Sequence, residues 1–95
     1  MTTINKKGWV EKLQKEGFSD IEVRPLPPAT DEKEHNHELY QVDVVLRGKL
    51  TISDESGPKT YLPGDRVDVP AGTIHIARGG PAGGEMIVGI KDKVA

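Results

Sequence analysis

The sequence has no cysteine, few aromatic residues, no block of basic residues and no long apolar run. The absence of cysteine excludes disulfide bonds, thiol catalysis and thiolate metal ligands. With one Trp, two Tyr and one Phe in 95 residues, the core must be thin and built mostly from Val, Ile and Leu. A net charge of -2 without a basic block argues against nucleic acid or an anionic membrane as a partner.

The apolar stretches are too short to cross a membrane. The first residues, 1–7, lack the apolar run of a signal peptide, so a cytoplasmic location is expected. The length suits one compact domain over residues 1–95. Because small domains bury a modest fraction of their surface, an oligomer interface would add stability.

A short helix is predicted over residues 5–16. Trp9, Val10 and Leu13 fall on one helical face. Asn5 is placed to cap the first turn, with Ile4 and Trp9 as a hydrophobic staple, and Gly17 is placed to end the helix.

The rest of the chain predicts a series of short strands and turns. Strands are expected over residues 21–26, 39–46, 49–53, 59–62, 66–69, 74–78 and 85–90, with turns at 47–48, 56–58 and 63–64. Pro25, Pro27 and Pro28 make the first strand an edge strand or a short one. This pattern indicates an all-β sandwich or barrel.

Alternation along residues 39–46 separates two faces. Gln41, Asp43 and Val45 share one face, and the other face is wholly apolar, with Val42, Val44 and Leu46. An apolar row of this kind should not face water. It must therefore meet the N-terminal helix, a second sheet or another subunit, and a homodimer is predicted on this basis.

The same alternation places His35 and His37 on the face of Gln41, and His75 follows later in the chain. Three imidazoles and one side-chain oxygen, brought together, make a plausible transition-metal site.

These residues resemble the two motifs of the cupin family. The first motif runs from Ala29 through His35, His37 and Gln41 to Gly48, and the second runs from Gly64 through Pro70, Gly72 and His75 to Gly79. Three positions depart from the family pattern: Ala29 replaces a Gly, Gln41 replaces a Glu, and Gly79 replaces an Asn.

The resemblance implies an antiparallel jelly-roll, or double-stranded β-helix, with a barrel core over about residues 21–91. It also implies one divalent transition metal held by His35, His37, Gln41 and His75, with Fe, Mn, Ni, Zn and Cu not distinguished. Gln41 brings no negative charge, so the metal would be held less firmly and would attract anionic ligands more strongly. In the alternative, Gln41 does not bind and a three-His centre has an additional open position.

The function expected from this resemblance is a metal-dependent enzyme, dioxygenase- or isomerase-like, acting on a small oxygen-rich molecule. Two alternatives stay open: a non-catalytic module that binds or senses a small ligand, and a structural homodimer stabilised by its metal. Asp43 is a candidate general base or neighbour of the metal, but pairing with a cation such as Arg66 is the favoured interpretation.

Overall fold

The computed structural model describes residues 5–28 and 38–91. One helix precedes seven strands in the order α1 (Lys6–Lys15), β1 (Ser19–Leu26), β2 (Tyr40–Arg47), β3 (Leu50–Asp54), β4 (Gly57–Tyr61), β5 (Arg66–Val69), β6 (Ile76–Gly79) and β7 (Gly84–Lys91). Within the described residues, no helix has both the length and the apolar character needed to cross a bilayer.

The helix begins and ends where its capping residues predict. The Asn5 side-chain oxygen accepts a hydrogen bond from the Gly8 N–H at 2.9 Å, which satisfies a donor that the first turn leaves unpaired. After Glu16, Gly17 adopts a φ of +97°, a conformation that costs glycine little. The predicted staple involves Ile4, which lies outside the described residues.

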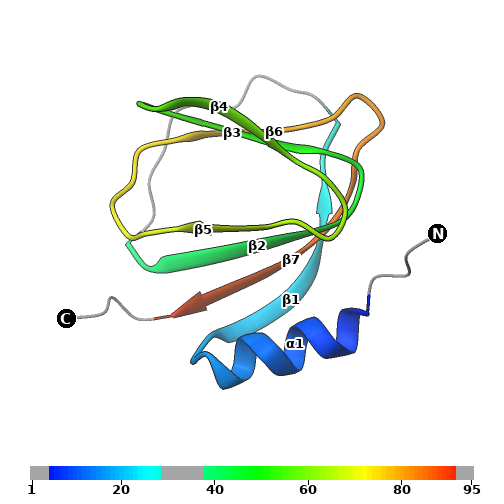
Figure 1. Cartoon of the computed structure of the whole chain (residues 1–95), viewed down its shortest axis with the longest axis vertical. Coiled ribbons are helices and arrows are strands. Elements are labelled where there is room, and N and C mark those ends of the chain that lie inside the picture. The colour runs from blue at the N-terminus through cyan, green and yellow to red at the C-terminus, as the bar shows by residue number, and fades with distance from the viewer. Residues whose placement is uncertain (1–4, 29–37, 92–95) are drawn as a thin grey trace.

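The strands form two antiparallel sheets that face each other (Figure 1). One sheet has the order β1-β7-β2-β5 and the other the order β4-β3-β6. The prediction that the proline-containing first strand lies at an edge is confirmed, because β1 pairs only with β7. The turn expected at residues 56–58 lies one residue earlier, at 55–56, and Gly57 and Pro58 already belong to β4.

The first of two cores fills the space between the sheets. Its buried members are Leu26, Val45, Leu50, Ile52, Val67 and Val69, with Tyr61, Ala77 and Met86 packed against them. The all-β, antiparallel class is therefore confirmed. The more specific prediction, a closed jelly-roll barrel, is not shown by the structure, because no described strand is hydrogen-bonded to both sheets.

The second core lies on the outer face of the four-stranded sheet, where α1 covers it (Figure 1). Val42 and Val44 are completely buried there against Leu13 and Phe18, and Leu46 packs beside them. The apolar row is thus covered within one chain. It no longer argues for a homodimer, which stays an untested prediction.

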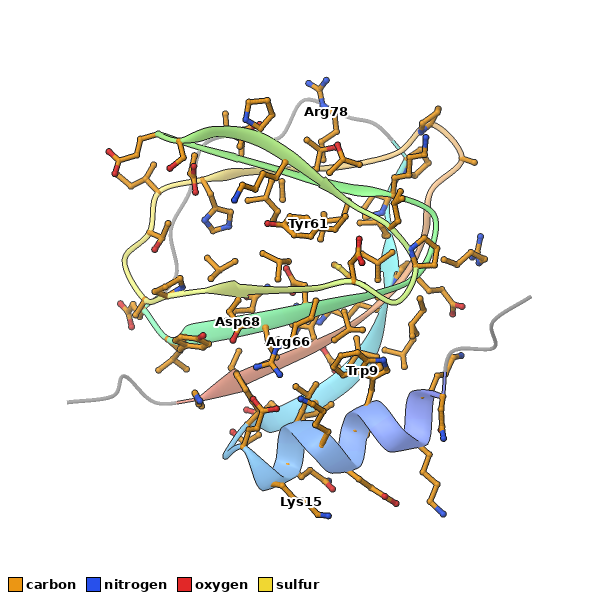
Figure 2. The ribbon with its side chains drawn as sticks, viewed as in Figure 1. Trp9, Lys15, Tyr61, Arg66, Asp68 and Arg78 are labelled. Atoms are coloured by element: carbon orange, nitrogen blue, oxygen red, sulfur yellow. The ribbon has the colours of Figure 1, made fainter. Side chains whose placement is uncertain are left out.

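Polar contacts fasten the end of α1 to this sheet. The Arg66 guanidinium donates to both carboxylate oxygens of Glu16, at 2.8 and 2.7 Å, and also to Asp68. Asp68 in turn accepts a hydrogen bond from the Tyr40 hydroxyl at 2.5 Å. Figure 2 shows Arg66 and Asp68 on the helix side of the sheet, whereas Tyr61 lies between the sheets.

Candidate functional site

His75 is a buried histidine that immediately precedes β6. Its side chain is 3% exposed, and its Nδ1 lies 2.9 Å from the Thr73 carbonyl oxygen. A carbonyl oxygen only accepts, so Nδ1–H is the donor of this contact, and Nε2 is the ring nitrogen left to face a metal. Histidines that bind metals commonly have this backbone contact, because it fixes the tautomer and the orientation of the ring.

Gln41 and Asp43 project from β2 toward the space between the sheets. The register places Asp43 opposite Val67 and Gln41 opposite Val69, both of which belong to the inner core. The Gln41 amide donates through Nε2 to Asp43 Oδ1 at 2.8 Å. The amide oxygen is therefore the end of Gln41 suited to a metal.

Asp43 is the most unusual residue of this interior. Its side chain is 4% exposed, and burial raises the pKa of its carboxyl above the ordinary value. The hydrogen bond from Gln41 and the electrostatic interactions with His75 and Arg24 lower this pKa.

The favoured interpretation pairs Asp43 with a cation such as Arg66, and the structure shows that Arg66 is not that cation. Arg66 stands opposite Val44 in the β2–β5 register, so it lies on the outer face and binds Glu16 and Asp68 there. Asp43 faces the interior, and the β2 pairing on either side of it is regular, so no bulge turns it outward.

An interior cavity of about 150 Å³ joins the candidate residues. Gln41, Asp43 and His75 line it, together with apolar residues that include Leu26, Leu50 and Met86. His35 and His37, the other two predicted ligands, lie outside the described residues. The part of the chain that the structure describes has no group of three or more His, Cys, Asp or Glu placed to hold a metal.

The donor chemistry of this cavity fits a divalent transition metal. An oriented imidazole nitrogen and an amide oxygen are ligands of intermediate and hard character, and Asp43 beside them supplies a carboxylate to hold the amide in place. These two donor types match what the resemblance implies, and the other two expected ligands, His35 and His37, lie outside the described residues.

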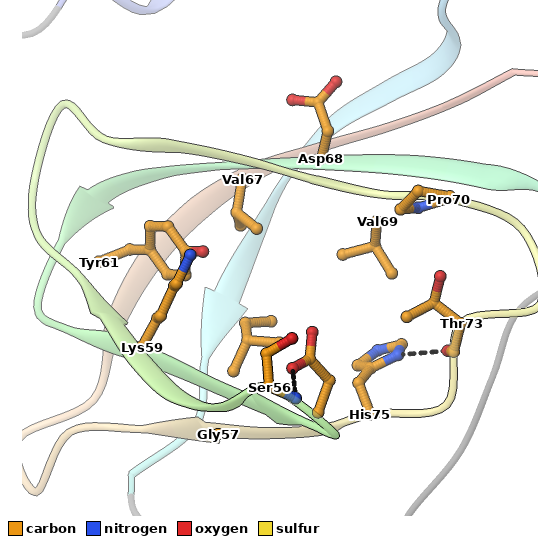
Figure 3. Close-up of a pocket in the computed structure, with 12 residues that line it drawn as sticks. Ser56, Gly57, Lys59, Tyr61, Val67, Asp68, Val69, Pro70, Thr73 and His75 are labelled. Carbon is orange, nitrogen blue, oxygen red and sulfur yellow. Dashed lines mark hydrogen bonds between the residues drawn. The ribbon is translucent and has the colours of Figure 1, made fainter.

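A second cavity of about 210 Å³ also reaches His75 (Figure 3). Apolar side chains from β3 and β5 form part of its wall, and its polar members include Lys59, Thr73 and the hydroxyl-bearing Tyr61. Sequence reasoning did not single out Lys59. The signal was available in the alternation of β4, which places Lys59 on the same face as Tyr61.

The structure gives a reason for one departure from the cupin pattern. A Cβ atom on Gly79 would lie 1.9 Å from the Pro27 carbonyl oxygen, so no side chain fits at the position where the motif has Asn. Gly48, at the end of the first motif, is similarly restricted, because a Cβ there would lie 2.2 Å from the Gly83 oxygen.

No family model matches the sequence, and no curated protein matches it either. Solved structures do match. A protein of unknown function from Rhizobium leguminosarum is 22% identical with a TM-score of 0.70, covering 76% of this chain and 68% of that one. An RmlC-like cupin from Shewanella frigidimarina is 24% identical with a TM-score of 0.63, covering 74% and 62%.

A third structure, described as a predicted oxalate decarboxylase from Thermotoga maritima, is 18% identical with a TM-score of 0.63 and covers 85% and 72%. The chain therefore spans about two thirds of the length of the Rhizobium protein and less than two thirds of the length of the Shewanella protein. At these identities the likeness concerns the fold. On the evidence of its two facing antiparallel sheets and these structural neighbours, the chain has the fold of a small cupin domain.

Proposed function

We propose that this chain binds one divalent transition metal between its sheets and uses it to act on a small oxygen-rich molecule. His35, His37 and His75 are the proposed imidazole ligands, and the amide oxygen of Gln41 is the fourth. When bound, the metal would supply Lewis-acid or redox chemistry.

One observation carries this proposal. The buried His75 ring, oriented by the Thr73 carbonyl, opens onto the same cavity as Gln41 and Asp43. Within the described residues, each buried side-chain polar atom has a hydrogen-bond partner, so the cluster is held in a fixed geometry. Its placement on the motif positions expected from the sequence supports a ligand-binding role.

The chain's own residues have distinct roles in this site. His75 would bind through Nε2, and the contact to Thr73 would hold the ring in place. Gln41 would bind through its amide oxygen while its N–H₂ group donates to Asp43. Asp43 therefore acts on Gln41 and is a positioning residue.

The size of the two cavities that reach His75 supports a small ligand. The two cavities measure about 150 and 210 Å³, below the roughly 300–1,000 Å³ of pockets that take drug-sized molecules. One structural neighbour is described as a predicted oxalate decarboxylase, and a short carboxylic acid would fit a cavity of this size.

Metal content tests the proposal. Wild type purified without chelator should hold about one metal ion per chain, whereas His37→Ala and His75→Ala should lose most of it. Gln14→Ala, a change on the exposed side of α1, is the control, and circular dichroism checks that each variant is folded. Equal metal content in all four proteins would contradict the proposal.

Turnover distinguishes an enzyme from a binding module. Metal-loaded protein should consume dioxygen or convert a candidate acid, and His75→Ala should not. A ligand-dependent thermal shift without any turnover would instead favour a non-catalytic binder.

A further inference from the structure

Lys59 is an exposed residue of the edge strand β4 that also lines the cavity of about 210 Å³. In the β3–β4 register, Lys59 stands opposite Ile52 and Tyr61 stands opposite Leu50, and Ile52 and Leu50 belong to the core between the sheets. The alternate residue Thr60 pairs with Thr51 on the other face, where the two hydroxyls lie 2.9 Å apart. Lys59 therefore occupies an inward-facing position.

The Lys59 side chain is exposed, so its ammonium group can stay in contact with water while the side chain lies along the mouth of a cavity. Among residues 5–28 and 38–91, no carboxylate forms an ion pair with Lys59. Asp54, the nearest acid along the hairpin that also lines the cavity, accepts a hydrogen bond from the Ser56 N–H at 2.8 Å. Within the described residues, the exposed ammonium group therefore has no carboxylate partner and is accessible to solvent or to an anion.

The cavity beside Lys59 combines one cation with apolar walls, and its two carboxylates, Asp54 and Asp68, are already bound to the Ser56 N–H and to Arg66. Its walls carry Ile52, Val67 and Val69, and its far end reaches His75. Figure 3 shows Lys59 and Tyr61 directed into this space from β4, with Val67 and Val69 on the facing strand. A ligand lying here would have one end near a cation and a phenol hydroxyl, and the other end near His75.

We propose that Lys59 recognises the carboxylate of the ligand, and that the ligand is a small carboxylic acid with a short apolar body. The ammonium forms a charge-assisted hydrogen bond to the carboxylate, the valines cover the apolar part, and the opposite end approaches His75. This inference rests on the proposed function for the position of the metal, but the anion contact itself does not need the metal.

Butanoate and butanamide are suitable probes, because they have nearly the same shape and differ in charge. Calorimetric titration compares wild type with Lys59→Met, which keeps the length of the side chain, and with Lys59→Arg, which keeps the charge. Lys49→Met, a change of an exposed lysine that lines neither cavity, is the matched control.

We expect Lys59→Met to weaken butanoate binding at least about tenfold and to leave butanamide binding unchanged. Lys59→Arg should retain most of the affinity, and Lys49→Met should behave as wild type. Equal butanoate affinity in wild type and Lys59→Met, or no preference of wild type for butanoate over butanamide, would overturn the inference.

The titrations are run on metal-loaded and on chelator-treated protein. If the protein binds no metal but still binds butanoate through Lys59, the inference stands and the proposed function fails. If the metal is bound and Lys59→Met changes nothing, the inference fails and the proposed function stands.

Nuclear magnetic resonance of wild type provides a test that does not depend on a variant folding. Butanoate should shift the backbone signals of Lys59, Tyr61, Thr73 and His75. Shifts confined to α1 or to the region of Lys49 would refute the assignment.

Discussion

Gln41 and Asp43 are best understood as a pair. A carboxylate buried to this degree needs a hydrogen-bond donor, and the Gln41 amide supplies one at 2.8 Å. The Glu that the cupin motif has at this position would place a second acid beside Asp43 on the same face of β2. The presence of Asp43 thus gives a physical reason for the amide at position 41.

This pairing predicts opposite effects of Gln41→Glu on the metal-free and the metal-loaded protein. Without metal, Asp43 loses a donor and gains a neighbouring acid, so the free energy of unfolding should fall by about 1–3 kcal/mol. With metal, the added negative charge should increase metal retention and restore much of the stability.

Thermal unfolding with and without metal, followed by dialysis against a chelator, measures both effects. Gln14→Glu, the same change on an exposed part of α1, is the control. If Gln41→Glu unfolds like wild type in both states, Gln41 is neither a partner of Asp43 nor a metal ligand, and the metal centre would consist of three histidines.

At the scale of elements, the end of α1 is fastened to β5. Arg66 on β5 binds Glu16 through two hydrogen bonds, and it lies beside Asp68, which Tyr40 of β2 also contacts. These contacts lower the pKa of Glu16 to about 2 and raise the pKa of Tyr40 to about 12. The hydrogen bond from Arg66 is the largest cause for Glu16, and that from Tyr40 to Asp68 is the largest for Tyr40.

The Glu16 contact predicts a pH-dependent effect of Glu16→Gln. A depressed pKa means that the stabilisation is present above the ordinary value of 4.5 and is lost as the pH falls toward about 2. Wild type should therefore be more stable than Glu16→Gln at pH 7, by up to about 1 kcal/mol because the pair is partly exposed and screened.

The difference between the two proteins should shrink as the pH is lowered from 4.5 to 2. Urea unfolding at several pH values measures it, with Glu11→Gln on the exposed side of the same helix as the control. A difference that is constant across this range would mean that Glu16 acts through something other than its charge.

For the whole molecule, the main question is how the outer face of the four-stranded sheet is covered. Leu13 is completely buried against this face. Leu13→Ala should lower the free energy of unfolding by about 2–4 kcal/mol, because it leaves a cavity between helix and sheet. Glu11→Ala on the exposed side of α1 should have little effect.

Unfolding of wild type and Leu13→Ala at two protein concentrations tests whether α1 of the same chain covers the apolar row on β2. If α1 covers the row, the denaturation midpoint of wild type does not depend on concentration. A midpoint that rises with concentration would indicate that association of chains stabilises the fold, as the homodimer prediction requires.

Alternation along β2 was enough to predict which face is apolar and which holds Gln41 and Asp43. It could not show whether a helix or another subunit covers Val42 and Val44, because that depends on contacts between distant parts of the chain. The pairing of Asp43 with Arg66 was predicted wrongly because the β2–β5 register, which places Arg66 opposite the outward-facing Val44, is not visible in either segment alone.

The position of the last strand has a consequence for how the protein is made. β7 lies between β1 and β2 and pairs with both, so the four-stranded sheet is divided until residues 84–91 are in place. A chain emerging from the ribosome can form α1 and the β3–β4 hairpin early, since these contacts are local. The sheet that carries Gln41 and Asp43 forms only after β7 has been synthesised, and until then β1 and β2 expose edges that a chaperone can protect.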